Sequence, residues 1–379
     1  MADFFLSEEQ IAIREMARKL SQGWEELSRT WDLGGSFDRE PIMGPIRKAG
    51  LAGMTIPPEY GGMGAPYLDF ILAYEQFARV NYTAAFLLGS TCSGPLDFIL
   101  NFGSPSLKAK HLPRLASGEH LAAVAITEPD AGSDLGAIRT RAKIEGDQVR
   151  INGGKFFVGG GGDCELYVVL VRMSDAPGVA GLGSVLVEKD APGLKFGAKF
   201  RMLGSRPVPR SEMIFEDCVV PVENILTEAG SFGRMIEVFN GERIHNACLA
   251  LGIALGAYEH AAEYAKERVQ FGKRLVDFQG IQWKLADMEM LLEATRCMIY
   301  RAAAAKDAGQ PLGVIVSQAK LFAATYCPMV VDQALQIEGA YGYTEGSRVE
   351  RAYRDIRLVP IAGGSVEMMR NYLGGRHAR

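Results

Sequence analysis

The period of the hydrophobic positions changes twice along the chain and divides it into three parts. From Ser7 to about Gly118, apolar residues recur at helical spacing, and clusters of Pro and Gly separate the helical segments. Ser7, with Gln10 three residues later, has the pattern of a helix capping box. Beyond Phe232 the chain returns to long Ala-, Leu-, Met- and Glu-rich periodic segments with few helix breakers. These parts predict a helical first domain and a last domain of about four long helices packed as a bundle.

The part between them, from about Leu121 to Thr227, consists of short β-rich runs bounded by Gly, Pro and Asp. The clearest of these runs cover residues 148–152, 166–172 and 184–188. We therefore predict an α+β multidomain protein. Its expected parts are an N-terminal α-helical domain at 1–120, a middle β-domain at 121–229 and a C-terminal helical bundle domain at 230–379.

Composition narrows the possible partners. The 379 residues are enough for two or three units of ordinary domain size and a large core. The net charge is −4, and Lys and Arg are scattered along the chain, which argues against a surface for nucleic acid or anionic membranes. The six cysteines are widely separated and include no Cys-x-x-Cys pair, which suits a reduced compartment and disfavours zinc. We expect small molecules and proteins as partners, and no metal.

The segment from Met1 to Leu6 has neither a secretory apolar region nor an Arg-rich transit pattern, so we expect a cytoplasmic protein. The longest apolar stretch, residues 84–100, is interrupted by glycine, proline and Asp97. It is shorter than a membrane span requires, and membrane insertion is not expected.

Residues 125–134 (Ala-Ile-Thr-Glu-Pro-Asp-Ala-Gly-Ser-Asp) follow a strand-like apolar run and combine small residues with hydroxyls. Gly and Ala let a backbone approach a ligand closely, and Thr127 and Ser133 can donate to phosphate or ring oxygens. Taken alone, the segment fits a surface turn equally well.

Four further blocks lie downstream of this loop: Glu267-Arg268-Val269-Gln270-Phe271-Gly272-Lys273, Phe278-Gln279, Gln336-Ile337-Glu338-Gly339-Ala340-Tyr341-Gly342-Tyr343 and Glu350-Arg351-Ala352-Tyr353-Arg354-Asp355. In this order they resemble the acyl-CoA dehydrogenase family. The resemblance extends over nearly the whole chain, including Pro57-Pro58-Glu59-Tyr60-Gly61-Gly62 near the start. It implies the acyl-CoA dehydrogenase fold, in which the middle domain is β-barrel-like and the last domain is a four-helix bundle. It also implies FAD as cofactor and an acyl-CoA substrate.

By this resemblance, residues 125–127 line the isoalloxazine ring, Phe157 forms an aromatic wall, and Ser133 meets the pyrophosphate or the pantetheine. The FAD contacts expected within the chain are Ala125, Ile126, Thr127, Gly132, Ser133, Phe157, Val158, Gly159, Ser365 and Glu367. The far end of FAD is expected to bind a neighbouring subunit through Arg268, Phe271, Gln279, Gln336, Gly339 and Ala340, which implies a homotetramer. Two of these residues have a simpler alternative. Arg268 could be an exposed arginine that only contacts its helix neighbours, and Gln336 could be only a cap residue at a helix end.

Gly159 departs from the family pattern, since it occupies the position of the hydroxyl that bonds flavin N5. Either a backbone N–H of the glycine run 159–162 replaces that bond, or the flavin is tuned differently.

Oxidation of a thioester at Cα–Cβ requires a base for the α-proton, polarisation of the thioester oxygen and a hydride acceptor. Many family members carry the base just before a Gly-Thr pair near the C-terminus, where this chain has Gly363. The isovaleryl-CoA and long-chain enzymes carry it on a helix of the last domain, and Glu242 matches that position. Glu242 is therefore our predicted catalytic base. The alternatives are that Glu242 is only a first-turn helix carboxylate, or that Glu367 is the base.

Apolar surroundings and substrate would raise the pKa of Glu242 toward neutrality, as a base needs. The oxyanion is expected to meet a backbone N–H near Gly363. The predicted substrate contacts are Ser133, Arg243, Gly363 and Gly364.

Several nearby residues admit two interpretations. Arg243 and Arg210 are candidates for CoA phosphates or for the pocket mouth, and Arg201 and Arg206 are weaker ones. His245 lies one turn after Glu242 and either bonds a polar acyl group or fills core space, of which we favour the second.

The position of the base and the space left by the glycines at 363 and 364 favour a branched or cyclic acyl-CoA. A dicarboxylic acyl group is not favoured, because residues 80–84, which match the region for glutaryl recognition in the family, lack an arginine for a distal carboxylate. The family implies an electron-transfer flavoprotein as electron acceptor. An enoyl-CoA reductase, a flavin oxidase or monooxygenase, and a non-catalytic nucleic-acid-binding member remain as alternatives, although the charge balance gives the last little support.

Overall fold

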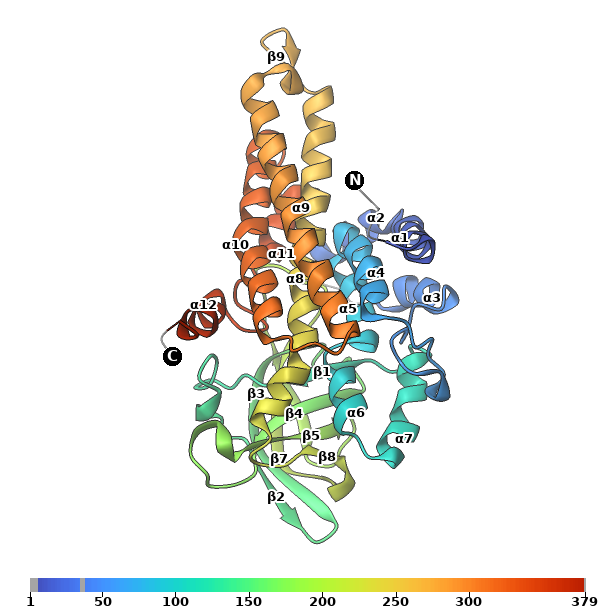
Figure 1. Cartoon of the computed structure of the whole chain (residues 1–379), viewed down its shortest axis with the longest axis vertical. Helices are drawn as coiled ribbons and strands as arrows, with labels where there is room; N and C mark the ends of the chain where they lie inside the picture. Colours follow the sequence, from blue (N-terminus) through green and yellow to red (C-terminus); the bar gives the residue numbers. More distant parts are fainter. Residues whose placement is uncertain (1–5, 35–37, 378–379) are drawn as a thin grey trace.

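The computed structural model describes residues 6–34 and 38–377, and it begins with a helical domain as predicted (Figure 1). Ser7 and Gln10 form the capping box, with Gln10 N–H donating to Ser7 Oγ at 3.2 Å and Ser7 N–H to Gln10 Oε1 at 3.1 Å. The helices of this part are α1 (Glu8–Ser21), α2 (Trp24–Gly34), α3 (Glu40–Lys48), α4 (Tyr67–Val80), α5 (Tyr82–Cys92), α6 (Pro95–Phe102) and α7 (Pro105–Ala116).

The middle of the chain forms a mostly antiparallel eight-stranded sheet, which confirms the predicted β-domain. The sheet order is β6-β7-β3-β2-β4-β5-β8, and β1 pairs in parallel with β4. All three predicted runs are strands. The bounds are β1 (Ala122–Ala125), β2 (Arg141–Glu145), β3 (Gln148–Gly159), β4 (Leu166–Arg172), β5 (Leu182–Glu188), β6 (Leu194–Lys199), β7 (Arg210–Pro221) and β8 (Ile225–Thr227).

The last part is a helical bundle, and its longest helix is α8 (Phe232–Glu267). Up to residue 377 it contains three long helices and two short ones instead of about four long ones, because glycines and prolines such as Gly346 and Pro360 interrupt the final segment. The further elements are the hairpin β9 (Val269–Gln270) and β10 (Lys273–Arg274), α9 (Gln279–Asp307), α10 (Gly313–Glu338), α11 (Arg348–Ile356) and α12 (Val366–Gly375). The predicted boundaries 120/121 and 229/230 lie in the connections before β1 and α8, and they stay predictions.

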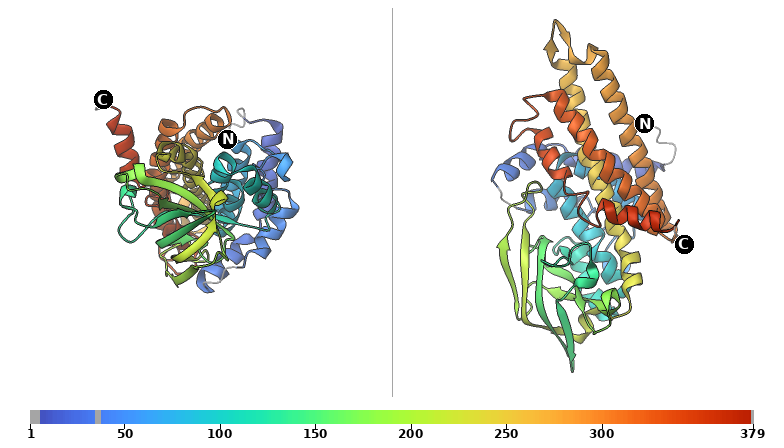
Figure 2. Two further views of the ribbon diagram at one scale, coloured as in Figure 1. Left: turned by 90° about the horizontal axis from the view of Figure 1, so that it is seen from below. Right: turned by 90° about the vertical axis from the view of Figure 1, so that its left-hand side faces the viewer.

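Helix α8 joins the parts, since it packs against α4 of the first domain as well as α9 and α10 (Figure 2). Two glycines allow the close approach to α4. A Cβ at Gly252 would lie 2.5 Å from the Cβ of Ala78, and one at Gly256 would lie 2.1 Å from the carbonyl oxygen of Arg79. No side chain larger than hydrogen fits at either position without moving α8.

Two helical stretches, Tyr82–Phe102 and Gly313–Glu338, are long and apolar enough to cross a membrane by length and composition alone. The first is 89% and the second 50% buried inside the protein. A core helix of a soluble protein passes the same test, so these stretches are weak evidence for a membrane span.

The loop after β1 is anchored by a buried ion pair. Lys155 Nζ lies 2.7 Å from Glu128 Oε1 and donates to the carbonyl oxygen of Ile126 at 3.0 Å. Glu128 also accepts from the N–H groups of Arg139 and Thr140. Burial lowers the pKa of Lys155 to about 8, whereas Lys155 and these N–H groups outweigh burial at Glu128 and lower its pKa. Both side chains are charged at neutral pH, and they hold residues 125–128 in place.

Replacing Lys155 with Met should destabilise the protein by about 3–5 kcal/mol, because the Glu128 carboxylate would stay buried without its counter-charge. The free energy of urea unfolding measures this cost. The matched control is Lys195→Met, which breaks an exposed pair with Glu216 and should cost less than about 1 kcal/mol. Equal losses in the two variants would contradict the anchoring role.

Candidate active site

Glu242 lies well inside α8, in its third turn, and not in the first turn as the alternative interpretation required. Its carboxylate reaches the connection between α5 and α6. A Cβ built on Gly94 would lie 2.2 Å from Glu242 Oε2, and Gly94 has a φ of +65°. Both observations require glycine at position 94. The side chain of Glu242 is 23% exposed, so the carboxylate is mostly shielded by two domains.

Two residues of the following turn of α8 hold the same carboxylate. His245 Nε2 lies 3.4 Å from Glu242 Oε1, and Asn246 Nδ2 donates to that oxygen at 3.0 Å. Burial alone would raise the pKa of Glu242, but the His245 ring and the hydrogen bonds from His245 and Asn246 outweigh burial and lower it. The lowered pKa is that of the protein without substrate, and the rise expected with substrate bound stays a prediction.

His245 also fills core space, which is the role that we favoured. Its ring packs against Tyr74 at 5.4 Å and Phe70 at 6.3 Å between centroids. Its Nδ1 is buried and has no hydrogen-bond partner among residues 6–34 and 38–377. The residue therefore combines packing with contact to the Glu242 carboxylate.

The two sequence positions that carry the base in different family members lie close together here. A Cβ at Gly363 would lie 3.0 Å from Asn246 Nδ2, the same atom that donates to Glu242. Arg243 donates from Nε to the carbonyl oxygen of Gly363 at 3.2 Å, and its guanidinium lies within 3.7 Å of a Cβ built on Gly364. The structure thus brings the predicted substrate contacts Arg243, Gly363 and Gly364 to the base. Asn246 and Gly94, which sequence reasoning missed, complete this cluster.

Phe157 has the geometry of an aromatic wall. It has a φ of +57°, its ring lies 4.6 Å from that of Phe200, and half of its surface is exposed, so a flat ring can stack on it. The neighbouring loop is joined to it, since Phe156 N–H donates to the carbonyl oxygen of Thr127 at 2.8 Å. Gly132 has open space around it, and Ser133 is exposed. Among the other predicted contacts, Ile126 and Thr127 are half-buried, and the remaining two, Ala125 and Val158, are buried. A polar loop beside an open aromatic face fits a flavin.

The glycine run beside this wall is tightly packed. The N–H groups of Gly160, Gly161 and Gly162 donate to Pro209 O, Val158 O and Tyr167 Oη, so these three are already used within the protein. Gly159 pairs with Arg210 across β3 and β7. A Cβ at Gly159 would lie 3.6 Å from the guanidinium of Arg210 and 3.7 Å from the ring of Phe86.

Ser365 and Glu367 lie at the start of α12. Ser365 caps the helix by accepting from Met368 N–H at 3.4 Å. Glu367 is exposed, and its pKa is lowered by a hydrogen bond from its own backbone N–H and by Ser365. Glu367 is open to water, whereas the Glu242 carboxylate is mostly shielded, and this difference weakens the alternative to Glu242.

The six residues predicted for a neighbouring subunit gather at the far end of the bundle, beside the β9–β10 hairpin and away from the middle sheet (Figure 1). All six are exposed: Arg268, Phe271, Gln279, Gln336, Gly339 and Ala340. Arg268 lies 6.0 Å from the centre of the Tyr341 ring, which connects the end of α8 with the end of α10. The β9–β10 hairpin lies at the opposite end of the molecule from the middle sheet, to which Phe157 belongs (Figure 1).

The weaker arginine candidates have other positions. Arg206 bonds Glu345 at 3.2 Å, and Arg201 is exposed on a loop. Within residues 6–34 and 38–377, no cluster of three or more His, Cys, Asp or Glu is arranged to hold a metal ion.

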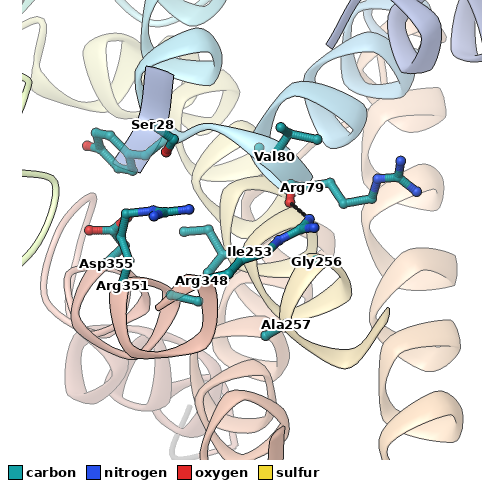
Figure 3. A pocket seen from close by; sticks show the side chains of 12 residues that line it. Ser28, Arg79, Val80, Ile253, Gly256, Ala257, Arg348, Arg351 and Asp355 are labelled. Atoms are coloured by element: carbon teal, nitrogen blue, oxygen red, sulfur yellow. Dashed lines mark hydrogen bonds between the residues drawn. The ribbon is translucent and has the colours of Figure 1, made fainter. Parts of the chain in front are cut away.

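A separate cavity of about 30 Å³, large enough for a single water, lies between the first domain and the bundle (Figure 3). Arg348 crosses it to donate to the carbonyl oxygen of Arg79 at 2.9 Å. Asp355 lies at its edge, and burial raises the pKa of this carboxyl to about 6. This cavity does not include Glu242, and we assign no function to it.

Three family models match the chain in order: Acyl-CoA dehydrogenase, N-terminal domain (residues 7–119), middle domain (123–218) and C-terminal domain (232–377). The short-chain specific acyl-CoA dehydrogenase of Clostridium acetobutylicum is 36% identical, covering 99% of each chain. The mitochondrial isobutyryl-CoA dehydrogenase of Dictyostelium discoideum is 38% identical over 96% of this chain and 88% of its own. The acryloyl-CoA reductase (NADH) of Anaerotignum propionicum is 35% identical over 97% of this chain and 93% of its own.

Solved structures agree. A chain in a structure of the electron transferring flavoprotein of Acidaminococcus fermentans superposes with a TM-score of 0.95 at 36% identity, covering 99% of both chains. Butyryl-CoA dehydrogenase from Megasphaera elsdenii superposes with a TM-score of 0.94 at 34% identity, and again 99% of both chains is covered. The chain therefore belongs to the acyl-CoA dehydrogenase family, the flavin-dependent oxidoreductases that act on CH–CH bonds.

Proposed function

We propose that this protein oxidises an acyl-CoA to the 2,3-enoyl-CoA, with Glu242 as the base that removes the α-proton. The observation that carries the proposal is the carboxylate of Glu242, held between Gly94, His245 and Asn246 and beside Gly363. This arrangement supports the isovaleryl-CoA and long-chain type, in which the base belongs to a helix of the last domain. Bound FAD would accept the hydride from the β-carbon.

The surroundings of Glu242 suit proton abstraction in two stages. In the free protein His245 and Asn246 lower its pKa, so the carboxylate is ionised and ready to accept a proton. An acyl chain that covers the carboxylate would exclude water and raise the pKa, which increases its basicity. A backbone N–H near Gly363 would polarise the thioester oxygen, and glycine at this position leaves that N–H accessible.

The acyl group stays a proposal. The glycines at 363 and 364 leave space for the branched or cyclic chain that the sequence favours, and one relative is named for isobutyryl-CoA. Other relatives are named for short-chain or butyryl substrates, so we propose a short acyl chain. An enoyl-CoA reductase is the second candidate, because one relative is an acryloyl-CoA reductase.

We propose an electron-transfer flavoprotein as acceptor, which the superposed chain from a structure of such a flavoprotein supports. We also propose a homotetramer in which the bundle end binds the far end of FAD on a neighbouring subunit. Large apolar side chains exposed on this domain support such contacts: Phe271, Trp283, Met290, Met329, Tyr341 and Tyr343.

Glu242→Gln should slow anaerobic flavin reduction by acyl-CoA by about 100- to 10,000-fold while FAD stays bound, because the amide cannot accept the α-proton. Stopped-flow absorbance with butyryl-, isobutyryl- and cyclohexanecarbonyl-CoA measures the rate. The comparison variant is Glu367→Gln, which removes the alternative base and should reduce its flavin, per FAD bound, at a rate close to that of the wild type. Equal rates in wild type and Glu242→Gln would remove Glu242 as the base.

His245→Leu should move the acid limb of kcat/KM to higher pH. The sign follows from Glu242: its pKa is lowered mainly by His245 against the effect of burial, so removing the ring leaves burial to raise it. The base would then be protonated at pH values where the wild type is ionised. The pH profile with one acyl-CoA measures the shift, and His377→Leu at the exposed chain end is the control. An unchanged acid limb would contradict the coupling.

Arg268→Ala should weaken FAD retention by at least about tenfold, since a charge-assisted hydrogen bond to the cofactor would be lost. The FAD content is measured after dialysis together with the mass in solution by light scattering. Arg274→Ala on the same hairpin, which removes a pair with Asp277, is the control. Full retention of FAD by an intact Arg268→Ala assembly would contradict the cross-subunit contact.

A further inference from the structure

Arg210, the first residue of β7, is a buried cation without a counter-charge. It is 7% exposed, and within the described residues it forms no ion pair. Its guanidinium donates to the carbonyl oxygen of Val208 at 3.2 Å and to the hydroxyl of Tyr82 at 2.7 Å. Arginine is rarely buried unless a carboxylate or another anion accompanies it. The other buried arginines among the described residues follow this rule: Arg296 pairs with Glu75, Arg351 with Glu25 and Arg354 with Asp32.

The residue paired with Arg210 on the neighbouring strand is a glycine, which leaves space for the guanidinium. Arg210 pairs with Gly159 of β3, and the position where a side chain would start at Gly159 lies 3.6 Å from the guanidinium. The ring of Phe86, on α5, borders the same position at 3.7 Å. The missing hydroxyl at residue 159 and the buried arginine are therefore two parts of one arrangement. Phe157, the predicted flavin wall, lies on the same strand as Gly159, two residues before it.

One face of α5 connects Arg210 with the catalytic end of the site. Tyr82, Phe86 and Gly89 are spaced by four and three residues and so lie on one face of the helix. At one end of this face Tyr82 bonds Arg210, and past the other end Gly94 touches Glu242. Between the two, the ring of Tyr74 lies near both Gly89 and His245. Phe86, whose ring borders the Gly159 position beside the guanidinium, lies about 9 Å along the helix axis from Cys92, the last residue of α5.

We propose that Arg210 and Tyr82 form an anion subsite for the distal end of the acyl chain, so that the preferred substrate is a short acyl-CoA ending in a carboxylate. This inference rests on the proposed function, because it takes Glu242 as the end where the α-carbon lies. A guanidinium can donate two parallel N–H groups to one carboxylate, and the Tyr82 hydroxyl orients the guanidinium. Residues 80–84 contain no arginine, but Tyr82 within them holds one that comes from β7.

A dicarboxylic substrate and its neutral counterpart of equal length test the subsite. The probes are glutaryl-CoA and pentanoyl-CoA. The dissociation constant of each is measured by flavin absorbance in holoenzyme carrying Glu242→Gln, which slows turnover, and kcat/KM is measured in holoenzyme with Glu242 intact. The subsite predicts tighter binding of glutaryl-CoA than of pentanoyl-CoA. In Arg210→Met, the affinity for glutaryl-CoA should fall by at least about 30-fold, and that for pentanoyl-CoA should change little.

Two further variants keep the test informative if Arg210→Met folds poorly. Arg210→Lys retains the charge and should recover part of the preference for glutaryl-CoA. Tyr82→Phe removes only the orienting hydroxyl and should reduce the preference by a smaller factor. Arg141→Met, which breaks an exposed pair with Asp175, is the matched control for loss of an arginine and should bind both probes as the parent does.

The outcomes separate the possibilities. Equal affinity of the parent for both probes would overturn the subsite. A loss in Arg210→Met that is the same for both probes would also overturn it, and would assign Arg210 to the flavin instead. The proposed function is judged separately by whether any acyl-CoA reduces the flavin in a manner that depends on Glu242. Reduction by pentanoyl-CoA but no preference for glutaryl-CoA would therefore retain the proposed function and reject the subsite.

Discussion

The close packing of α8 on α4 is the constraint on which the site depends. At Gly252 and Gly256 the backbones approach so closely that a methyl group would collide with Ala78 or the carbonyl of Arg79. This contact sets the height and rotation of α8 against the first domain. Ten residues earlier on α8, the same rotation directs Glu242 toward Gly94 and packs His245 against Tyr74 and Phe70.

Charge compensation distinguishes structural from functional groups in this interior. Glu128 is matched by Lys155, and Arg354 by Asp32, so these pairs stabilise loops and helices. Glu242, the proposed base, is only partly compensated, by a histidine and an amide. Arg210 has hydrogen bonds but, in the part of the chain that the structure describes, no opposite charge. A buried charge without a partner costs free energy unless a ligand supplies that partner. This is why we take Arg210 as a sign that the substrate carries an anionic group.

Much of the fold and part of the site were accessible from the sequence. The period of the apolar residues located β4 to the residue and identified the helical first and last parts. Family resemblance singled out Glu242 and Phe157, whose positions suit the roles proposed for them. Asn246 and Gly94 were missed because an isolated Asn or Gly carries no periodic signal, and their importance lies in contacts across the fold. The number of long bundle helices was overestimated because glycines and prolines shorten the final segment.

The amino-acid sequence was enough to identify the helical and β-rich parts, their order, the family and the missing carboxylate at Gly363. These depend on local patterns and on residue identity, which a chain displays without folding. The folded structure was needed to show that Asn246 lies between Gly363 and Glu242, that His245 lowers the pKa of Glu242, and that Arg210 bonds Tyr82. Arg210 and Tyr82 are 128 residues apart. Electrostatic interactions depend on distance and burial, and for residues so far apart both are set only when the domains pack together.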